Sequence, residues 1–227
     1  MINESVHRVL SWARYLCWAE ELRQAYEATG AEDETSGTGT MGIIAHYYGS
    51  LFVVIEGWEE IGLKDAVIES LLRHPAAYKD LLRRFRNGAF HYRPSVIDHK
   101  TLGIMKKGEE HVLWVRALHD EFIRFFREWL SSFKGTPHEK TDLKESVTGI
   151  LGFIPATASD KAINSLQETT NAARQMLHDH PPSLETSLNA FNLKKSIRQS
   201  LAAIAETKRK AEQIRRDRLK KLGILVR

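Results

Sequence analysis

The apolar residues of this 227-residue chain recur every three or four positions along nearly its whole length. This spacing places them on one side of an α-helix, whereas a half-buried strand would require alternation of apolar and polar residues. The first such stripe consists of Val6, Val9, Leu10, Ala13, Leu16 and Cys17. The periodicity therefore predicts an all-α helical bundle whose first helix spans about residues 4–28.

Residues that disfavour helix predict where the other helices begin and end. The Gly-, Ser- and Thr-rich residues 29–40 predict a loop, and Pro94 prevents a helix from continuing past Arg93 because proline lacks an amide hydrogen. Thr157 or Ser159 is expected to cap the helix that follows it. The further helices are predicted over about residues 41–60, 64–73, 75–93, 110–133, 139–152, 158–179 and 184–222.

The stretch KGTPHEK, residues 134–140, predicts a boundary near residue 137. The chain is accordingly divided into an N-terminal helical bundle, residues 1–137, and a C-terminal helical extension, residues 138–227. The last predicted helix has apolar residues at a spacing near three to four. It fits a partner-binding helix, a coiled-coil arm or a helix folded back on the body.

Charge is distributed unevenly along the chain. The net charge is +4, yet residues 194–227 contain twelve Lys and Arg against three acids, so the remainder carries −5. A basic end can bind nucleic acid or an acidic partner, although a solvated helix face that maintains solubility explains it equally well.

The chain has one cysteine, Cys17, so an internal disulfide cannot form. This cysteine usage is typical of a reducing cytoplasm. The most apolar stretch, residues 41–63, contains His46, Glu56 and two further glutamates. It therefore predicts a buried core helix rather than a membrane span, and no membrane association is expected.

Three arginines, an asparagine and a histidine lie within RFRNGAFHYR, residues 84–93. The spacing of arginine and histidine alone is uninformative, because four pairs in the chain fit it. Arg86 and His91 stand out because Asn87 follows the arginine in the only Arg-Asn dipeptide of the chain. On a regular helix these two side chains would point about 140° apart. Their joint action requires a helix break near Gly88, or residues from a second subunit.

The helix that carries this segment has a predicted buried stripe. Its members are Leu81, Leu82, Phe85 and Ala89. A rigid element of this kind can hold functional side chains in a fixed geometry.

LLRRFRNGAFHYR resembles the signature of the HEPN superfamily, in which Arg-Asn-x-x-x-His lies in a compact helical bundle. Residues 86–91, RNGAFH, match that form. The similarity covers roughly residues 5–133 and does not include residues 138–227. Some branches carry a tyrosine two residues after the histidine, a position occupied here by Arg93. The resemblance implies a HEPN-like helical bundle with an additional C-terminal helical region.

The resemblance implies metal-independent cleavage of RNA, or RNA binding in members that have lost catalysis. It also implies a homodimer with a composite active site, to which Arg86, Asn87 and His91 contribute. The residue types suit this chemistry, because an imidazole moves protons near neutral pH and a guanidinium stabilises charge on the phosphorane. Asn87 would orient His91 or the phosphate. No cofactor and no metal site are expected.

Structural interpretations of these residues compete with the functional ones. Arg86 and His91 also fit a helix-end arginine and a half-buried, hydrogen-bonded histidine. Glu56 fits a buried carboxylate that orients Arg86 or His91, and equally fits the solvent edge of its helix. His46 is interpreted as a core histidine with satisfied hydrogen bonds.

Basic residues outside the motif are predicted to contact RNA phosphates. They are Arg83, Arg84, Arg93, Lys208, Arg209, Lys210, Arg215 and Arg216. Contacts of this kind provide affinity without sequence choice.

The sequence thus favours a HEPN-type endoribonuclease that cleaves RNA through the 2′-hydroxyl. A prokaryotic antiviral-defence or toxin–antitoxin role rests on the family resemblance alone. One alternative is a catalytically inactive helical RNA-binding or protein-interaction scaffold. Another is a toxin-like module held inactive by an antitoxin or regulatory protein bound to residues 138–227.

Overall fold

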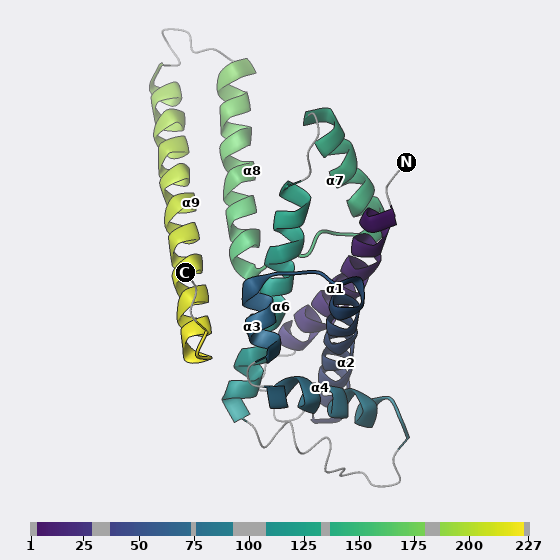
Figure 1. Cartoon of the computed structure of the whole chain (residues 1–227). Helices are drawn as coiled ribbons and strands as arrows, with labels where there is room; N and C mark the ends of the chain where they lie inside the picture. Colours follow the sequence, from purple (N-terminus) through teal and green to yellow (C-terminus); the bar gives the residue numbers. More distant parts are fainter. Residues whose placement is uncertain are drawn as a thin grey trace. The chain divides into compact units, whose positions relative to one another are not determined.

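The computed structural model describes residues 4–28, 37–73, 76–92, 108–132, 137–179 and 187–224. Every regular element within these ranges is an α-helix, which confirms the predicted all-α fold. The helices are α1 Glu4–Ala28, α2 Gly37–Ile61, α3 Ala66–Arg73, α4 Ala76–Ala89, α6 Gly108–Ser131, α7 Pro137–Leu151, α8 Ala158–Asp179 and α9 Ser187–Lys221 (Figure 1).

Two helix ends differ more than the others from the sequence prediction. The first is the start of α2, which begins at Gly37, inside the predicted loop of residues 29–40. A helix that is already nucleated gains one hydrogen bond for each residue added, so it can extend through poor helix formers. The second is the end of α4, which ends at Ala89 rather than near Arg93. Residues 29–36 and 93–107 lie outside the described ranges.

The chain forms two compact units, one up to Pro155 and one from Ala156 to Lys221. The predicted boundary at residue 137 falls at the start of α7, which the structure groups with the first unit. This helix packs on α1, and the Cys17 thiol lies 3.5 Å from the carbonyl oxygen of Phe153, just beyond the end of α7. The unit containing the Arg-Asn motif is therefore larger than predicted.

Aromatic residues fill the interior of the first unit, where α1 packs along α2 and against α6. The ring of Trp12 lies 5.8 Å from those of both Trp58 and Phe122. Its indole nitrogen donates a hydrogen bond of 3.0 Å to the carbonyl oxygen of Val54. Because Trp12 is 3% exposed, this bond satisfies a donor that would otherwise be buried without a partner.

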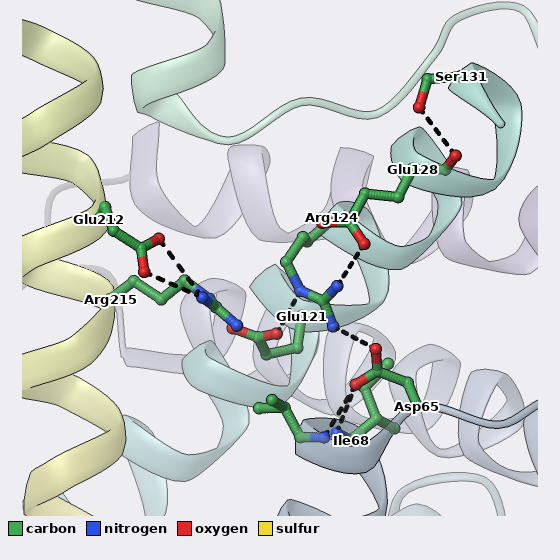
Figure 2. Close-up of polar contacts among 9 residues, drawn as sticks. Asp65, Ile68, Glu121, Arg124, Glu128, Ser131, Glu212 and Arg215 are labelled. Atoms are coloured by element: carbon green, nitrogen blue, oxygen red, sulfur yellow. Dashed lines mark hydrogen bonds and ion pairs between the residues drawn. The ribbon is translucent and has the colours of Figure 1, made fainter. Parts of the chain in front are cut away.

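A polar cluster ties α3 to α6 at the start of α3. Oδ1 of Asp65 accepts hydrogen bonds of 3.0 Å from the amides of Val67 and Ile68, and so caps α3. The guanidinium of Arg124 donates to Asp65, Glu121 and Glu128 through its Nη2, Nε and Nη1 atoms, at 2.7, 2.6 and 2.7 Å (Figure 2). Burial alone would raise the pKa of Asp65, but the Arg124 hydrogen bond and the two amides lower it.

Two helix ends match their sequence signals. Gly62 has a φ of 70° just after α2, and its amide donates a hydrogen bond of 3.2 Å to the carbonyl oxygen of Glu59. Only glycine adopts this left-handed conformation readily. Thr157 caps α8, since its Oγ1 accepts from the amide of Asp160 at 3.2 Å while the Asp160 carboxylate accepts from the Thr157 amide at 3.0 Å.

The second unit contains α8 and α9, which lie side by side and run antiparallel (Figure 1). Within this unit the last helix of the chain packs against α8. Several large apolar side chains of the pair are exposed. They are Met176, Leu201 and Ile214.

Candidate functional site

The helix that carries the Arg-Asn motif, α4, is fixed to α2 by apolar side chains. Leu82 and Phe85 are buried, and the ring of Phe85 lies 5.6 Å from the ring of Tyr48 on α2. Leu81 is half-buried and Ala89 is exposed, so the buried stripe is narrower than predicted. Arg86, which follows Phe85, therefore projects from a fixed stretch of backbone.

The guanidinium of Arg86 is held by two side chains of α2. Its Nη2 atom donates a hydrogen bond of 2.6 Å to Oε1 of Glu56, and its Cζ atom lies 5.0 Å from the centre of the Phe52 ring. The predicted pairing of Glu56 with Arg86 is present, but the expectation of a buried carboxylate is wrong, since 47% of the Glu56 side chain is exposed. Glu56 lies at the solvent edge of α2, as Glu59 and Glu60 do.

His91 lies two residues beyond the end of α4 at Ala89. Its side chain is exposed, so the interpretation as a half-buried histidine is wrong. Because the helix ends before His91, the 140° separation of a regular helix does not apply. Among the described residues, no hydrogen bond or ion pair joins Arg86 to His91. The neighbours Phe90 and Tyr92 are 51% and 92% exposed.

Phe90 anchors the segment after α4 onto α2. Its amide donates to the carbonyl oxygen of Arg86 at 3.0 Å, and a side chain at Gly49 of α2 would clash with its ring. The ring of His46 meets the Phe90 ring edge-on, with centroids 5.3 Å apart. His46 is exposed, and its Nδ1 atom lies 2.8 Å from the carbonyl oxygen of Gly42. The interpretation of His46 as a core residue is therefore wrong.

The other predicted polar residues of this region are neighbours of Arg86 in the sequence. Asn87 is half-buried on α4. Arg83 and Arg84 both pair with Asp80 at 2.6 Å, and the hydrogen bond from Arg83, followed by the charge of Arg84, lowers the pKa of Asp80. Both arginines are exposed, so a phosphate can reach them. Arg93 lies outside the described residues.

The predicted RNA-binding residues of the tail lie on α9, in the second unit. Lys208 is exposed. The others pair with acids one turn away on the same helix. These pairs join Arg209 and Lys210 to Glu206, and Arg215 and Arg216 to Glu212. Arg215 is half-buried, whereas Arg209, Lys210 and Arg216 are exposed, and exposed pairs contribute little to stability.

A buried polar cluster lies inside the first unit, and the sequence analysis missed it. Glu20, Tyr47 and His119 are at most 2% exposed. The Tyr47 hydroxyl lies 3.0 Å from Nδ1 of His119, and Arg23 donates a hydrogen bond of 2.7 Å to Glu20. Burial, and then the charge of Arg23, lower the pKa of His119 well below its usual value. The signal in the sequence was Glu20, which falls three residues after Cys17 on the apolar stripe.

His111 is a second buried histidine that the sequence analysis missed. It is fully buried on α6, and the rings of Tyr48, Tyr78 and Trp114 lie within 6 Å of its ring, at 5.8, 5.4 and 5.9 Å. Neither ring nitrogen has a hydrogen-bond partner in the described part of the chain. Burial lowers the pKa of His111 to about 4. This imidazole is therefore neutral at pH 7 and closed to a substrate.

Within the described ranges, no three His, Cys, Asp or Glu side chains are arranged to hold a metal ion. None of the described helices is long and apolar enough to cross a membrane. Comparison of the chain with protein-family models, with curated proteins and with solved structures finds no match.

Proposed function

We propose that this chain is a HEPN-type endoribonuclease that cleaves RNA without a metal ion, with Arg86, Asn87 and His91 at its site. The observation that supports this most is the placement of Arg86 and His91. Arg86 lies near the end of α4 and is held by Glu56 and Phe52 of α2. His91 is exposed in the segment that directly follows α4. A positioned cation and an accessible imidazole are two of the groups that this cleavage needs.

In the proposed reaction the 2′-hydroxyl of the substrate attacks the adjacent phosphorus and expels the 5′-oxygen. An imidazole serves as a general base or acid in this exchange, and a histidine near neutral pH is suited to either role. The guanidinium of Arg86 stabilises the charge of the phosphorane. Glu56 takes up one of its five N–H donors, which leaves the guanidinium able to bind phosphate while the carboxylate keeps it in position.

The exposed aromatic side chains beside His91 favour unpaired RNA as the substrate. Phe90 and Tyr92 flank this histidine and are exposed by half or more. Unstacked bases bind well to such rings, whereas the bases of a duplex are already stacked on one another. The 2′-hydroxyl requirement explains selection of RNA over DNA.

The HEPN resemblance extends the proposal to partners and setting. It supports a homodimer whose composite site receives Arg86 and His91 from both copies. It also supports a cytoplasmic role in prokaryotic antiviral defence or as the toxin of a toxin–antitoxin pair, with a regulatory protein on residues 138–227.

The test is cleavage of unpaired and structured RNA by the purified full-length chain in the presence of EDTA. We expect wild-type cutting to persist in EDTA and to fall about 100-fold or more in Arg86→Ala and His91→Ala. Arg73→Ala, at an exposed arginine near the end of α3, is the matched control. RNA binding without cutting, unchanged in both variants, would exclude the enzyme.

The second candidate is an RNA-binding protein without catalysis, and the basic residues of α9 favour it. The exposed run Lys208, Arg209 and Lys210 offers three adjacent cations. Replacing all three with glutamine in the full-length chain should lower RNA affinity and reduce the salt dependence of binding. Unchanged cleavage with weakened binding would make α9 an accessory surface of the enzyme. Weakened binding in a protein that never cuts RNA would favour this second candidate.

A further inference from the structure

One side of α2 contacts the end of α4 and the residues that follow it. Glu56 and Phe52 hold Arg86. One to two turns earlier on α2, Gly49 and His46 contact the ring of Phe90. The spacing of three or four residues between these positions places them on one side of the helix. His46 is therefore positioned beside the segment that contains His91.

The hydrogen bonding of His46 determines which of its ring nitrogens carries the proton. Nδ1 lies 2.8 Å from the carbonyl oxygen of Gly42, and a carbonyl oxygen can only accept. Nδ1 must therefore carry the hydrogen when this bond forms. In the neutral ring, the lone pair then resides on Nε2. Because the His46 side chain is exposed, a substrate can reach this imidazole.

We infer that His46 is a second catalytic histidine of the site, and that it acts as the general base. This inference rests on the proposed ribonuclease function. Phe90 contacts His46 through its ring and is followed directly by His91, so His46 contacts the residue that precedes His91 in the chain. Phosphodiester cleavage uses both a base for the 2′-hydroxyl and an acid for the 5′-oxygen, and His46 and His91 of one copy supply the two roles.

His46 and His91 together account for both proton transfers of the cleavage step. Nε2 of His46 takes the proton of the 2′-hydroxyl, and the 2′-oxygen forms its bond to phosphorus. The bond between phosphorus and the 5′-oxygen breaks, and protonated His91 gives its proton to that oxygen. The products are a 2′,3′-cyclic phosphate and a 5′-hydroxyl. Solvent then returns both histidines to their starting protonation states.

The first measurement uses His46→Ala and His46→Gln in the full-length chain. Gln retains a donor for the carbonyl oxygen of Gly42 but has no basic nitrogen. We expect both variants to cleave an oligoribonucleotide about 100-fold more slowly. The uncleavable analogue is the same strand with a 2′-deoxy residue at the cut position. Both variants should bind it within about twofold of the wild-type affinity, because the substitution removes the chemical step and not the binding. Thermal unfolding should be unchanged, because the side chain is exposed.

His7→Ala is the matched control. His7 is exposed on α1, and Trp12, five residues further along, contacts Val54 and Trp58 in the second half of α2. His7 therefore lies toward the opposite end of α2 from His46. Its substitution should leave cleavage at the wild-type rate.

The second measurement assigns the roles of the two histidines. The oligoribonucleotide is remade with sulfur in place of the 5′-oxygen at the cut position, because a thiolate departs without needing a proton. We expect this linkage to restore cleavage by His91→Ala, which lacks the acid, and not by His46→Ala, which lacks the base. Restoration of the His46 variant instead would overturn the assignment.

The outcomes separate this inference from the proposed function. Wild-type cleavage by His46→Ala, with Arg86→Ala and His91→Ala inactive, would refute the role of His46 and leave the ribonuclease standing. A wild-type chain that cuts no RNA would overturn both.

Discussion

Arg124 and Arg86 both hold helices of the first unit together, but their surroundings differ. Arg124 uses all three of its nitrogen atoms on carboxylates, from Asp65, Glu121 and Glu128 (Figure 2). Arg86 gives one hydrogen bond to Glu56 and rests on an aromatic ring. A guanidinium with a carboxylate on each of its nitrogen atoms has little left to offer a ligand, whereas one with a single carboxylate partner can still bind a phosphate.

Four histidines of the described part of the chain divide in the same way. His111 and His119 are fully buried, and burial lowers the pKa of both. His46 and His91 are exposed beside α4. His111 and His119 thus contribute to packing in the interior. His46 and His91 lie where an imidazole can exchange a proton with a bound molecule. Four predictions test this division between interior and site.

The largest expected effect is on catalysis by Arg86→Ala. RNA cleavage should fall about 100- to 1,000-fold, because the charge of the phosphorane loses its cation. The free energy of unfolding should fall by only about 1 kcal/mol, as for an exposed ion pair. Cleavage rates and urea unfolding of the same preparation check both parts. If the free energy of unfolding fell by several kcal/mol with little change in cleavage, Arg86 would be a stabilising residue like Arg124.

The next effect is the dependence of stability on pH through His111. Its folded-state pKa of about 4 lies below the ordinary value of 6.5. The unfolded chain therefore binds this proton more readily, and stability is full above pH 6.5 and declines as the pH falls toward 4. The contribution is on the order of 3 kcal/mol. Urea unfolding of the wild type and of His111→Phe at several pH values should show a flatter curve for the variant.

Arg124→Ala should lower the free energy of unfolding by about 2–3 kcal/mol, because nearly buried carboxylates lose a charged partner. The side chains of Asp65 and Glu121 are only 18% and 3% exposed. Cleavage at a temperature where the variant is folded should be close to that of the wild type. Loss of cleavage by the folded variant would contradict the division between the two arginines.

Gly49→Ala should have the smallest effect. The new methyl group displaces the flexible ring of Phe90 and with it the segment containing His91. We expect cleavage to fall about tenfold, since small displacements of catalytic groups are costly. Thermal unfolding should change little, because Phe90 is half exposed. Gly149→Ala on α7 is the control, since beyond its chain neighbours and its own helix backbone no atom lies within 4 Å of the position of its added carbon. Equal activity of both variants would show that the position of Phe90 is unimportant.

Local signals in the sequence were sufficient for most of the helices. The first helix has the predicted bounds, and Gly62 and Thr157 act at helix ends as their residue types suggest. These features depend on neighbours within one or two turns, so they can be deduced without a fold. The pairing of Glu56 with Arg86 was one of two alternatives, and the sequence alone did not choose between them.

Tertiary packing decided what local signals could not. His46 falls in an apolar run, and its exposure depends on which side of α2 is left uncovered. Phe90 turns the chain after α4 onto Gly49, 41 positions earlier in the sequence. The sequence by itself determined the helices and the Arg-Asn motif. Only the packing of α4 on α2 decided that Arg86, His46 and the segment of His91 share one surface, because contacts between residues distant in the chain exist only in the folded bundle.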